Sequence, residues 1–256
     1  MRLCVTLPCF FGDADVCEAI KAVRSLGYDA VEIYGWKKLD LDEVKRVCDD
    51  EGVELLSLCT SEFRMNDPTF REAWLDGLRE SCEAAVRLGA KKLITQVGQD
   101  TGEARERQHA AIVETFIAAR DILASYDVTV MMEPLNLKVN HPGYYLYSSA
   151  EAFHIADEVG DPRVRVVDDI YHQQVTEGDI LNSVTKNLDK IAHLHAAGHP
   201  GRIEPWLGEL NYGFIFDAID KAGYTGACGL EYRPTVGVEE SLGQAIKLYG
   251  KNKIIK

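Results

Sequence analysis

The segment Leu88-Gly89-Ala90-Lys91 joins a helical pattern to the apolar run 92–97 through a single glycine. Glycine ends a helix at low cost, because it adopts the left-handed backbone conformation that other residues adopt only at a cost. The same order of helix, glycine and apolar run recurs around Gly27, Gly52, Gly160 and Gly223. The chain is therefore predicted to alternate helices with strands from end to end.

Apolar runs of strand length indicate where the strands lie, and helical spacings of apolar residues fall between them. The predicted strands cover 3–7, 30–34, 54–59, 92–97, 129–132, 164–167, 191–195 and 227–231. Alternating strands and helices form a parallel sheet covered by helices. About eight such units in 256 residues match the size of a (β/α)8 barrel. We therefore predict the α/β class and a single TIM-barrel domain over residues 1–256.

An open, doubly wound sheet is the alternative architecture, but the sequence contains neither its Gly-x-Gly-x-x-Gly fingerprint nor a P-loop. We expect no organic cofactor. Helix starts are predicted from Asp and Ser residues of the capping type, at Asp13, Asp67 and Ser148.

Composition limits the partners of the protein. Asp and Glu number 41 against 28 Lys and Arg, which gives a formal net charge of −13. This charge repels phosphate backbones and argues against a nucleic-acid partner. The sequence has no signal-peptide pattern and no apolar run long enough to cross a membrane. We therefore expect a cytoplasmic protein with no membrane partner.

The last four predicted strands end in side chains that bind metal ions, and the C-terminal strand ends carry the chemistry of a barrel. These side chains are Glu133, Asp168 or Asp169, His193 and His195, and Glu231. Side chains alternate faces along a strand, so one of the two aspartates points to the barrel axis while the two histidines share a face. Three carboxylates and one imidazole can then converge. Such an oxygen-rich site suits Mn²⁺, Mg²⁺ or Co²⁺ better than zinc.

Several short motifs reinforce this interpretation. They are Glu133-Pro-Leu-Asn136, His141-Pro-Gly-Tyr144, Asp169-Ile-Tyr-His172, Pro200-Gly-Arg202 with Glu204-Pro205, Gly208-Glu-Leu-Asn-Tyr212 and Gly229-Leu-Glu-Tyr232. With these motifs the chain resembles, over nearly its whole length, the xylose-isomerase-like barrels, and within them the group of hydroxypyruvate isomerases and tagatose/psicose 3-epimerases. The motifs are specific together and weak singly.

The resemblance implies roles for six residues and one divalent metal ion. Glu133, Asp169, His195 and Glu231 match the metal ligands, while His172 and Arg202 match substrate-contacting positions. The family also implies a homodimer or homotetramer. One position departs from the pattern: hydroxypyruvate isomerases commonly carry Gln where this chain has His195, a residue typical of the ketose epimerases. The exchange preserves metal binding and leaves the substrate open.

The residues at these positions support proton transfer between adjacent carbons. Glu133 and Glu231 would flank the substrate, and we interpret them as the catalytic acid/base pair. One glutamate that takes and returns the proton gives an isomerase of a sugar or hydroxy-oxo acid, whereas two acting from opposite faces give a ketose 3-epimerase. The guanidinium fork of Arg202 matches a carboxylate and favours a small oxo acid. Arg64 is a weaker candidate for the same role.

Three other functions remain as alternatives. Related barrels dehydrate inositol-derived ketones or cleave C-glycosides, with a similar metal and base but with loss of a leaving group. A zinc phosphodiesterase acting on DNA would need more histidine and carboxylate ligands on strands 2 to 4, where this chain offers Glu32 and Glu62 without a histidine. A sugar-binding subunit without turnover would have no reason to keep the carboxylates. A metal-dependent sugar or sugar-acid isomerase is therefore the predicted function.

Overall fold

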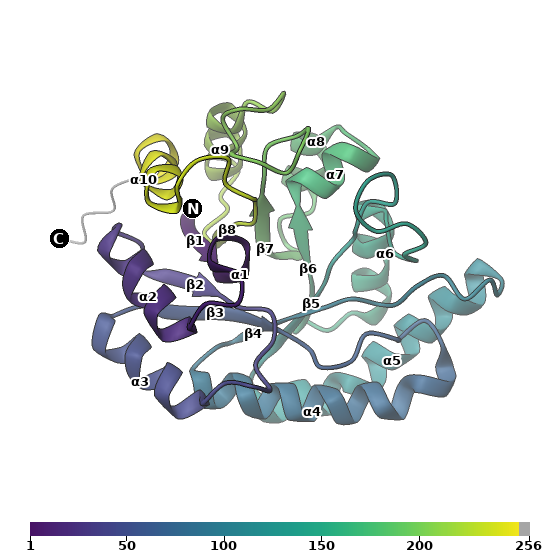
Figure 1. Ribbon diagram of the computed structural model, residues 1–256. Coiled ribbons are helices and arrows are strands. Elements are labelled where there is room, and N and C mark those ends of the chain that lie inside the picture. The colour runs from purple at the N-terminus through teal and green to yellow at the C-terminus, as the bar shows by residue number, and fades with distance from the viewer. Residues whose placement is uncertain (251–256) are drawn as a thin grey trace.

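The computed structural model describes residues 1–250, in which eight parallel strands close into one barrel in the order of the sequence (Figure 1). β1 also pairs with β8, and this pairing closes the barrel. The strands are β1 (Arg2–Thr6), β2 (Ala30–Glu32), β3 (Glu54–Cys59), β4 (Lys92–Thr95), β5 (Thr129–Met132), β6 (Val164–Asp169), β7 (Ile191–Ala196) and β8 (Ala227–Leu230). The predicted (β/α)8 fold is confirmed.

Helices surround the barrel and connect successive strands (Figure 1). Among residues 1–250, no helix combines the length and apolar character needed to cross a membrane. The helices are α1 (Leu7–Phe11), α2 (Val16–Ser25), α3 (Leu41–Glu51), the 3-10 helix η1 (Pro68–Phe70), α4 (Arg71–Leu88), α5 (Arg105–Tyr126), α6 (Ser149–Val159), α7 (Ile170–Thr176), α8 (Ile180–Lys186), α9 (Tyr212–Lys221) and α10 (Val238–Tyr249).

Glycines end the helices as the sequence predicts. Gly52, Gly89 and Gly160 occupy the C-cap positions of α3, α4 and α6, with φ values of 63°, 77° and 63°. Gly27 and Gly223 also have positive φ, one residue beyond the C-caps of α2 and α9. The chain therefore turns back to each following strand within a few residues.

The predicted caps are correct in two of three places. Asp67 and Ser148 accept backbone N–H groups at the starts of η1 and α6. The prediction for Asp13 is wrong, because α2 begins at Val16 and Asp15 accepts the N–H of Glu18 instead.

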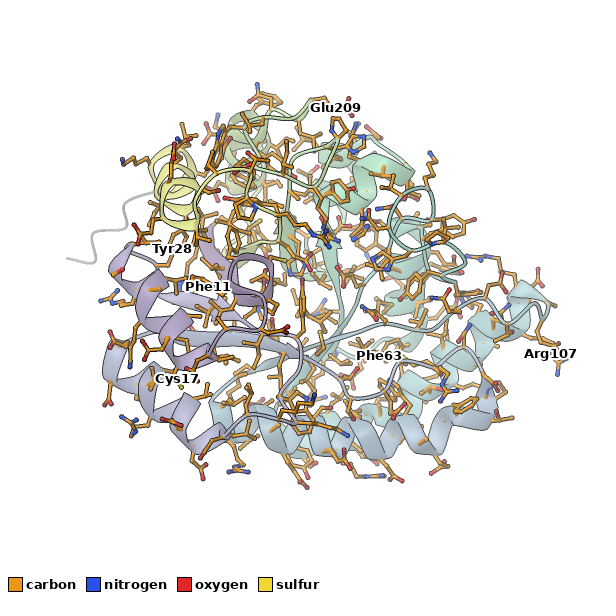
Figure 2. The ribbon with its side chains drawn as sticks, in the orientation of Figure 1. Phe11, Cys17, Tyr28, Phe63, Arg107 and Glu209 are labelled. Atoms are coloured by element: carbon orange, nitrogen blue, oxygen red, sulfur yellow. The ribbon has the colours of Figure 1, made fainter. Side chains whose placement is uncertain are left out.

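Apolar side chains fill the space between strands and helices and form one large core. Figure 2 shows this filled interior, with Arg107 and Glu209 projecting outward at its edges. Polar residues lie at the C-terminal ends of the strands, beyond this core. Two helices begin there without an intervening loop, since α1 starts directly after β1 and α7 directly after β6. These direct connections fix the backbone at the polar end of the barrel.

Candidate active site and metal centre

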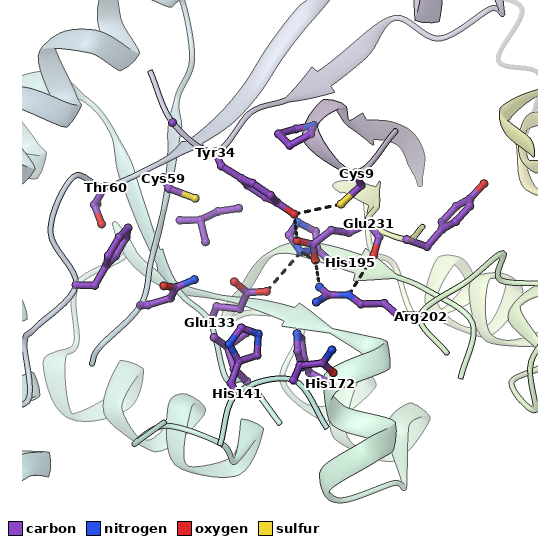
Figure 3. A pocket seen from close by; sticks show the side chains of 18 of the residues that line it. Cys9, Tyr34, Cys59, Thr60, Glu133, His141, His172, His195, Arg202 and Glu231 are labelled. Atoms are coloured by element: carbon purple, nitrogen blue, oxygen red, sulfur yellow. Dashed lines mark hydrogen bonds and ion pairs between the residues drawn. The ribbon is translucent and has the colours of Figure 1, made fainter. Parts of the chain in front are cut away.

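A cavity of about 1090 Å³ opens at the C-terminal ends of the strands (Figure 3). Five of the six predicted site residues line it, namely Glu133, His172, His195, Arg202 and Glu231. The sixth, Asp169, is buried at the end of β6 and contacts Arg202. The structure therefore brings all six residues to one place.

The four predicted ligands form a compact cluster. One donor atom from each of Glu133, Asp169, His195 and Glu231 lies within 4.8 Å of the others, and all four side chains are buried. The residues come from four consecutive strands: Glu133 follows β5, Asp169 ends β6, His195 lies in β7 and Glu231 follows β8. Because the strands of the barrel are parallel, their C-terminal ends, and therefore these residues, lie at the same end of the barrel.

Two atoms of this cluster show that the residues fit a metal ion. Oε1 of Glu133 and Nδ1 of His195 are buried and make no hydrogen bond within the described residues. Nδ1 lies 3.6 Å from that Oε1 and 3.0 Å from Oε2 of Glu231, without hydrogen-bond geometry. Buried polar atoms normally have partners, so two such atoms facing one another indicate a shared cation. Three carboxylates with one imidazole suit a divalent ion.

Glu32 of β2 contacts His195 on the Nε2 side of its ring, opposite the cluster. Its Oε1 lies 3.2 Å from Nε2 of His195, an ion-pair distance without hydrogen-bond geometry, and its Oε2 lies 3.1 Å from Nε2 of His193. Thr6 and Ser57 donate hydroxyl hydrogen bonds of 2.6 and 2.8 Å to the same carboxylate. A carboxylate on one ring nitrogen turns the other toward the metal position. Glu32 therefore positions Nδ1 of His195 in the cluster.

Burial and charge act against each other in this network. Burial alone favours the neutral forms, but the Glu231 and Glu32 carboxylates outweigh it and raise the pKa of His195 well above its ordinary value. In the same way, burial opposes ionisation of Glu32, but His195 and His193 hold its pKa well below the usual range. In the metal-free protein these contacts favour a protonated His195 beside ionised Glu32 and Glu231. Burial instead raises the pKa of Glu133, and it raises the pKa of Asp169 to about 7.

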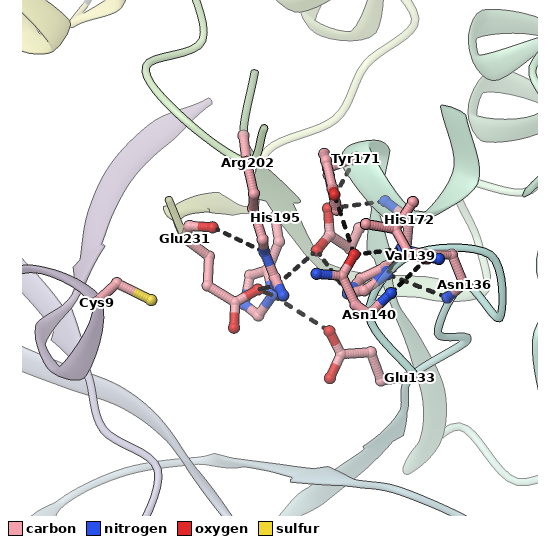
Figure 4. Close-up of polar contacts among 12 residues, drawn as sticks. Cys9, Glu133, Asn136, Val139, Asn140, Tyr171, His172, His195, Arg202 and Glu231 are labelled. Carbon is pink, nitrogen blue, oxygen red and sulfur yellow. Dashed lines mark hydrogen bonds and ion pairs between the residues drawn. The ribbon is translucent and has the colours of Figure 1, made fainter. Parts of the chain in front are cut away.

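Arg202 reaches the cluster from the loop after β7 (Figure 4). Its Nη2 lies 2.6 Å from Oε2 of Glu231 and 3.3 Å from Oδ2 of Asp169. The backbone of Arg202 has φ 54°, a left-handed conformation that is costly for a residue with a side chain. Such strain persists where surrounding structure enforces it, often at functional sites. The loop thus aims a fixed positive charge at two of the four ligands.

His172 presents an N–H group toward the cluster. Its Nδ1 lies 3.1 Å from the backbone nitrogen of Asn136, which donates to it, and 2.6 Å from the side-chain nitrogen of the same residue. Nδ1 is therefore the acceptor, which assigns the proton to Nε2. Nε2 is buried, lies 3.5 Å from Oδ2 of Asp169 and makes no hydrogen bond among residues 1–250. Burial, then Arg202, holds the pKa of His172 well below its ordinary value, so the ring is neutral.

The two neighbouring aspartates of β6 point to different places, as the alternation of a strand requires. Oδ2 of Asp169 faces the cluster, while its Oδ1 accepts the N–H groups of Tyr171 and His172 and starts α7. Asp168 instead accepts a 2.7 Å hydrogen bond from the hydroxyl of Ser149 at the start of α6. Burial raises the pKa of Asp168 to about 6. Asp168 thus joins β6 to a helix and stays out of the cluster.

Three residues support the site in roles that sequence analysis did not predict. Glu32 and Asn136 act through long-range contacts, and the hydroxyl of Tyr34 donates to Oε1 of Glu231 while lying 3.3 Å from Sγ of Cys9. Alternation along the predicted strand 30–34 offers one clue, because Tyr34 follows Glu32 by two residues. Arg64 does not line the cavity; its guanidinium stacks on the ring of Phe70 at 3.7 Å. The structure thus places Arg64 against Phe70 and outside the lining of the cavity.

Comparisons with known proteins agree with this geometry. A family model described as "Xylose isomerase-like TIM barrel" matches residues 20–249. The hydroxypyruvate isomerase of Escherichia coli K12 is 31% identical, with 94% of this chain and 97% of that protein covered. The 2-oxo-tetronate isomerase of Cupriavidus necator is 36% identical, over 68% of this chain and 67% of that protein. A crystal structure titled AP endonuclease, family 2, from Brucella melitensis is 26% identical, with a TM-score of 0.92, and covers 97% of this chain and 100% of that one.

Proposed function

We propose that this chain, which belongs to the xylose isomerase-like TIM barrels and is a sugar-acid isomerase, acts on a small hydroxy-oxo acid. It would interconvert the carbonyl and hydroxyl groups of two adjacent carbons, with a divalent metal ion at the four-residue cluster. Hydroxypyruvate and 2-oxo-tetronate, the acids in the names of the two relatives, are the first substrates to test. The observation that carries the proposal is the convergence of four ligand atoms within 4.8 Å beside Arg202.

The reaction needs one carboxylate that removes a proton from carbon and returns it to the neighbouring carbon. Both oxygens of Glu231 are engaged, one by Tyr34 and the other by Arg202. Glu133 also lines the cavity, and its Oε1 accepts no hydrogen bond within the described residues. We therefore assign proton transfer to Glu133, with Glu231 held as a fixed charge.

A metal ion held by Glu133, Asp169, His195 and Glu231 would stabilise negative charge on the two substrate oxygens. For hydroxypyruvate, Glu133 takes a proton from the hydroxymethyl carbon and delivers it to the former carbonyl carbon, while the hydroxyl proton moves to the former carbonyl oxygen. His172 Nε2–H is placed to donate a hydrogen bond to a substrate oxygen, and Arg202 lines the cavity where a substrate carboxylate would bind.

A ketose 3-epimerase is the second candidate, favoured by the presence of two glutamates at one cluster. Epimerisation requires both Glu133 and Glu231 to exchange protons from opposite faces of the substrate. The engagement of both Glu231 oxygens argues for the isomerase.

The test is proton exchange followed by NMR in D₂O, with the metal-loaded enzyme and hydroxypyruvate, 2-oxo-tetronate or a ketohexose. Glu133→Gln should slow C–H exchange by about 10²-fold or more, since general-base catalysis contributes that much. Glu54→Gln, which changes an exposed carboxylate at the N-terminal end of β3, is the control and should exchange normally. Exchange of ketohexoses at C3, without turnover of the oxo acids, would instead identify an epimerase. Unchanged exchange in Glu133→Gln would contradict the assignment of the base.

A further inference from the structure

A second cluster of metal-binding side chains lies between α5 and α6, neighbouring helices of the outer layer (Figure 1). His109 of α5 faces His154 and Glu158 of α6, and one donor atom from each lies within 4.8 Å of the others. None of the three lines the cavity at the strand ends. This cluster, called here the outer triad, is therefore separate from the proposed active site.

The donors of the outer triad already converge on one point. Nε2 of His109 and Nε2 of His154 each lie 2.8 Å from the same oxygen of Glu158. His154 and Glu158 are four residues apart on one helix and so share a face. Zinc binds such donors at about 2.0–2.2 Å, which places them roughly 3 to 4 Å apart. Small side-chain rotations would therefore complete the site.

A supporting layer stands behind His109. Its other ring nitrogen, Nδ1, lies 3.5 Å from Oε1 of Glu151. Glu151 is itself fixed by Arg105 and by a 3.1 Å hydrogen bond from the hydroxyl of Tyr145. Metal-binding histidines characteristically face a carboxylate on the nitrogen that does not bind the ion. This arrangement turns Nε2 of His109 toward Glu158.

We propose that the outer triad is a zinc site, with two imidazoles and one carboxylate as ligands and solvent in the remaining position. Two nitrogens and one oxygen match the ligand preference of zinc, unlike the oxygen-rich cluster in the barrel. The side chain of His154 is 68% exposed, which leaves the outward side open to solvent. A bound ion would tie α5 to α6, and α6 is the helix that follows the loop carrying His141 into the cavity.

The test counts zinc ions bound to the full-length, metal-stripped protein by equilibrium dialysis and elemental analysis. His154→Ala and Glu158→Gln should each bind one equivalent fewer than the unaltered chain, or bind it at least about tenfold more weakly. Asp157→Asn removes a neighbouring exposed carboxylate of the same helix and should bind zinc normally. The count is a difference between variants, so it holds whether or not the cluster in the barrel also binds an ion.

NMR of the histidine rings provides the second readout. Zinc should shift the imidazole signals of His109 and His154 together, and Glu158→Gln should weaken both shifts. Equal zinc counts in all variants, or a shift confined to His154, would overturn the proposal and leave the triad as a hydrogen-bonded surface cluster. Because the variants lie at a partly exposed helix surface, circular dichroism will confirm that each remains folded.

Discussion

Glu32 shows how a single buried carboxylate organises residues from three other strands. It contacts Thr6, Ser57, His193 and His195 while only 1% of its surface is exposed. Its role depends on accepting at both oxygens, because all four partners can present hydrogen to it. An amide at this position would place an N–H₂ group against donors. The placement of His195 therefore depends on this carboxylate.

We predict that Glu32→Gln lowers the free energy of unfolding by about 3–5 kcal/mol at pH 7, the loss expected when one partner of a buried ion pair is removed. Urea unfolding followed by circular dichroism measures this difference. Glu54→Gln is the control, since the Glu54 side chain is 54% exposed and its pair with Arg2 lies at the surface. Such pairs contribute about 0–1 kcal/mol. Equal losses of unfolding free energy in the two variants would show that Glu32 does not stabilise the site.

The same substitution makes a prediction about pH. The folded protein holds the pKa of Glu32 well below 4.5, so the folded state binds its proton less tightly than the unfolded state. The stability from this carboxylate is therefore fully present above about pH 4.5 and is lost as pH falls through the folded-state pKa. The stability gap between the unaltered chain and Glu32→Gln should narrow below pH 4.5. A gap that widens on acidification would reverse the assigned direction.

At the scale of elements, the C-terminal glycines of the helices control how the chain turns back into the barrel. Gly52 has φ 63° with no atom within 4 Å of an added Cβ, so Gly52→Ala tests backbone conformation alone. We expect it to destabilise the protein by about 1–2 kcal/mol. Gly243 lies inside α10, also with open space, and has no positive φ. Gly243→Ala should stabilise by about 0.5–1 kcal/mol. Thermal unfolding measures the change in stability of both variants. A change of the same sign in both would contradict the prediction.

Element boundaries show what sequence patterns predict well. The predicted strands 54–59 and 129–132 match β3 and β5 at both ends. The strand predicted at 30–34 is shorter, because β2 ends at Glu32, where its register with β3 shifts. The strand predicted at 164–167 instead extends to Asp169, where it pairs with β7. Hydrophobicity marks which segments form strands, whereas pairing between distant segments decides where they stop.

The site shows the same difference between what local sequence patterns predict and what long-range contacts decide. The strand ends placed Glu133, His195, Glu231 and one of the two aspartates Asp168 and Asp169 together, and the family resemblance selected Asp169. The roles of Glu32 and Asn136 could not be predicted in this way, since they depend on which side chains meet across the barrel. The hydrogen bonds of Asn136 to His172 join two different strand-end loops, and no local spacing encodes that contact. Topology thus brings the proposed ligands together, and packing determines which side chains orient them.

At the scale of the whole molecule, the fold concentrates negative charge at one end of the barrel. Glu133, Asp169 and Glu231 meet there in a chain whose formal net charge is already −13. His195 and Arg202 supply positive charge within contact of these carboxylates. Burying like charges together is costly unless they are paired. A divalent cation at the cluster would offset the cost of burying three carboxylates together, so its binding should stabilise the fold.

Thermal unfolding of the chelator-treated protein tests this whole-molecule effect. Mn²⁺ at 100 times its dissociation constant should stabilise the fold by about 2.7 kcal/mol, or roughly 5–10 °C in Tm for a chain of this size. Asp169→Asn should lose most of the shift because it removes a ligand. Asp168→Asn is the matched control: it changes the adjacent carboxylate, which points to Ser149, and should keep the shift. Equal shifts in the two variants, or none in the unaltered chain, would show that the cluster does not hold the ion.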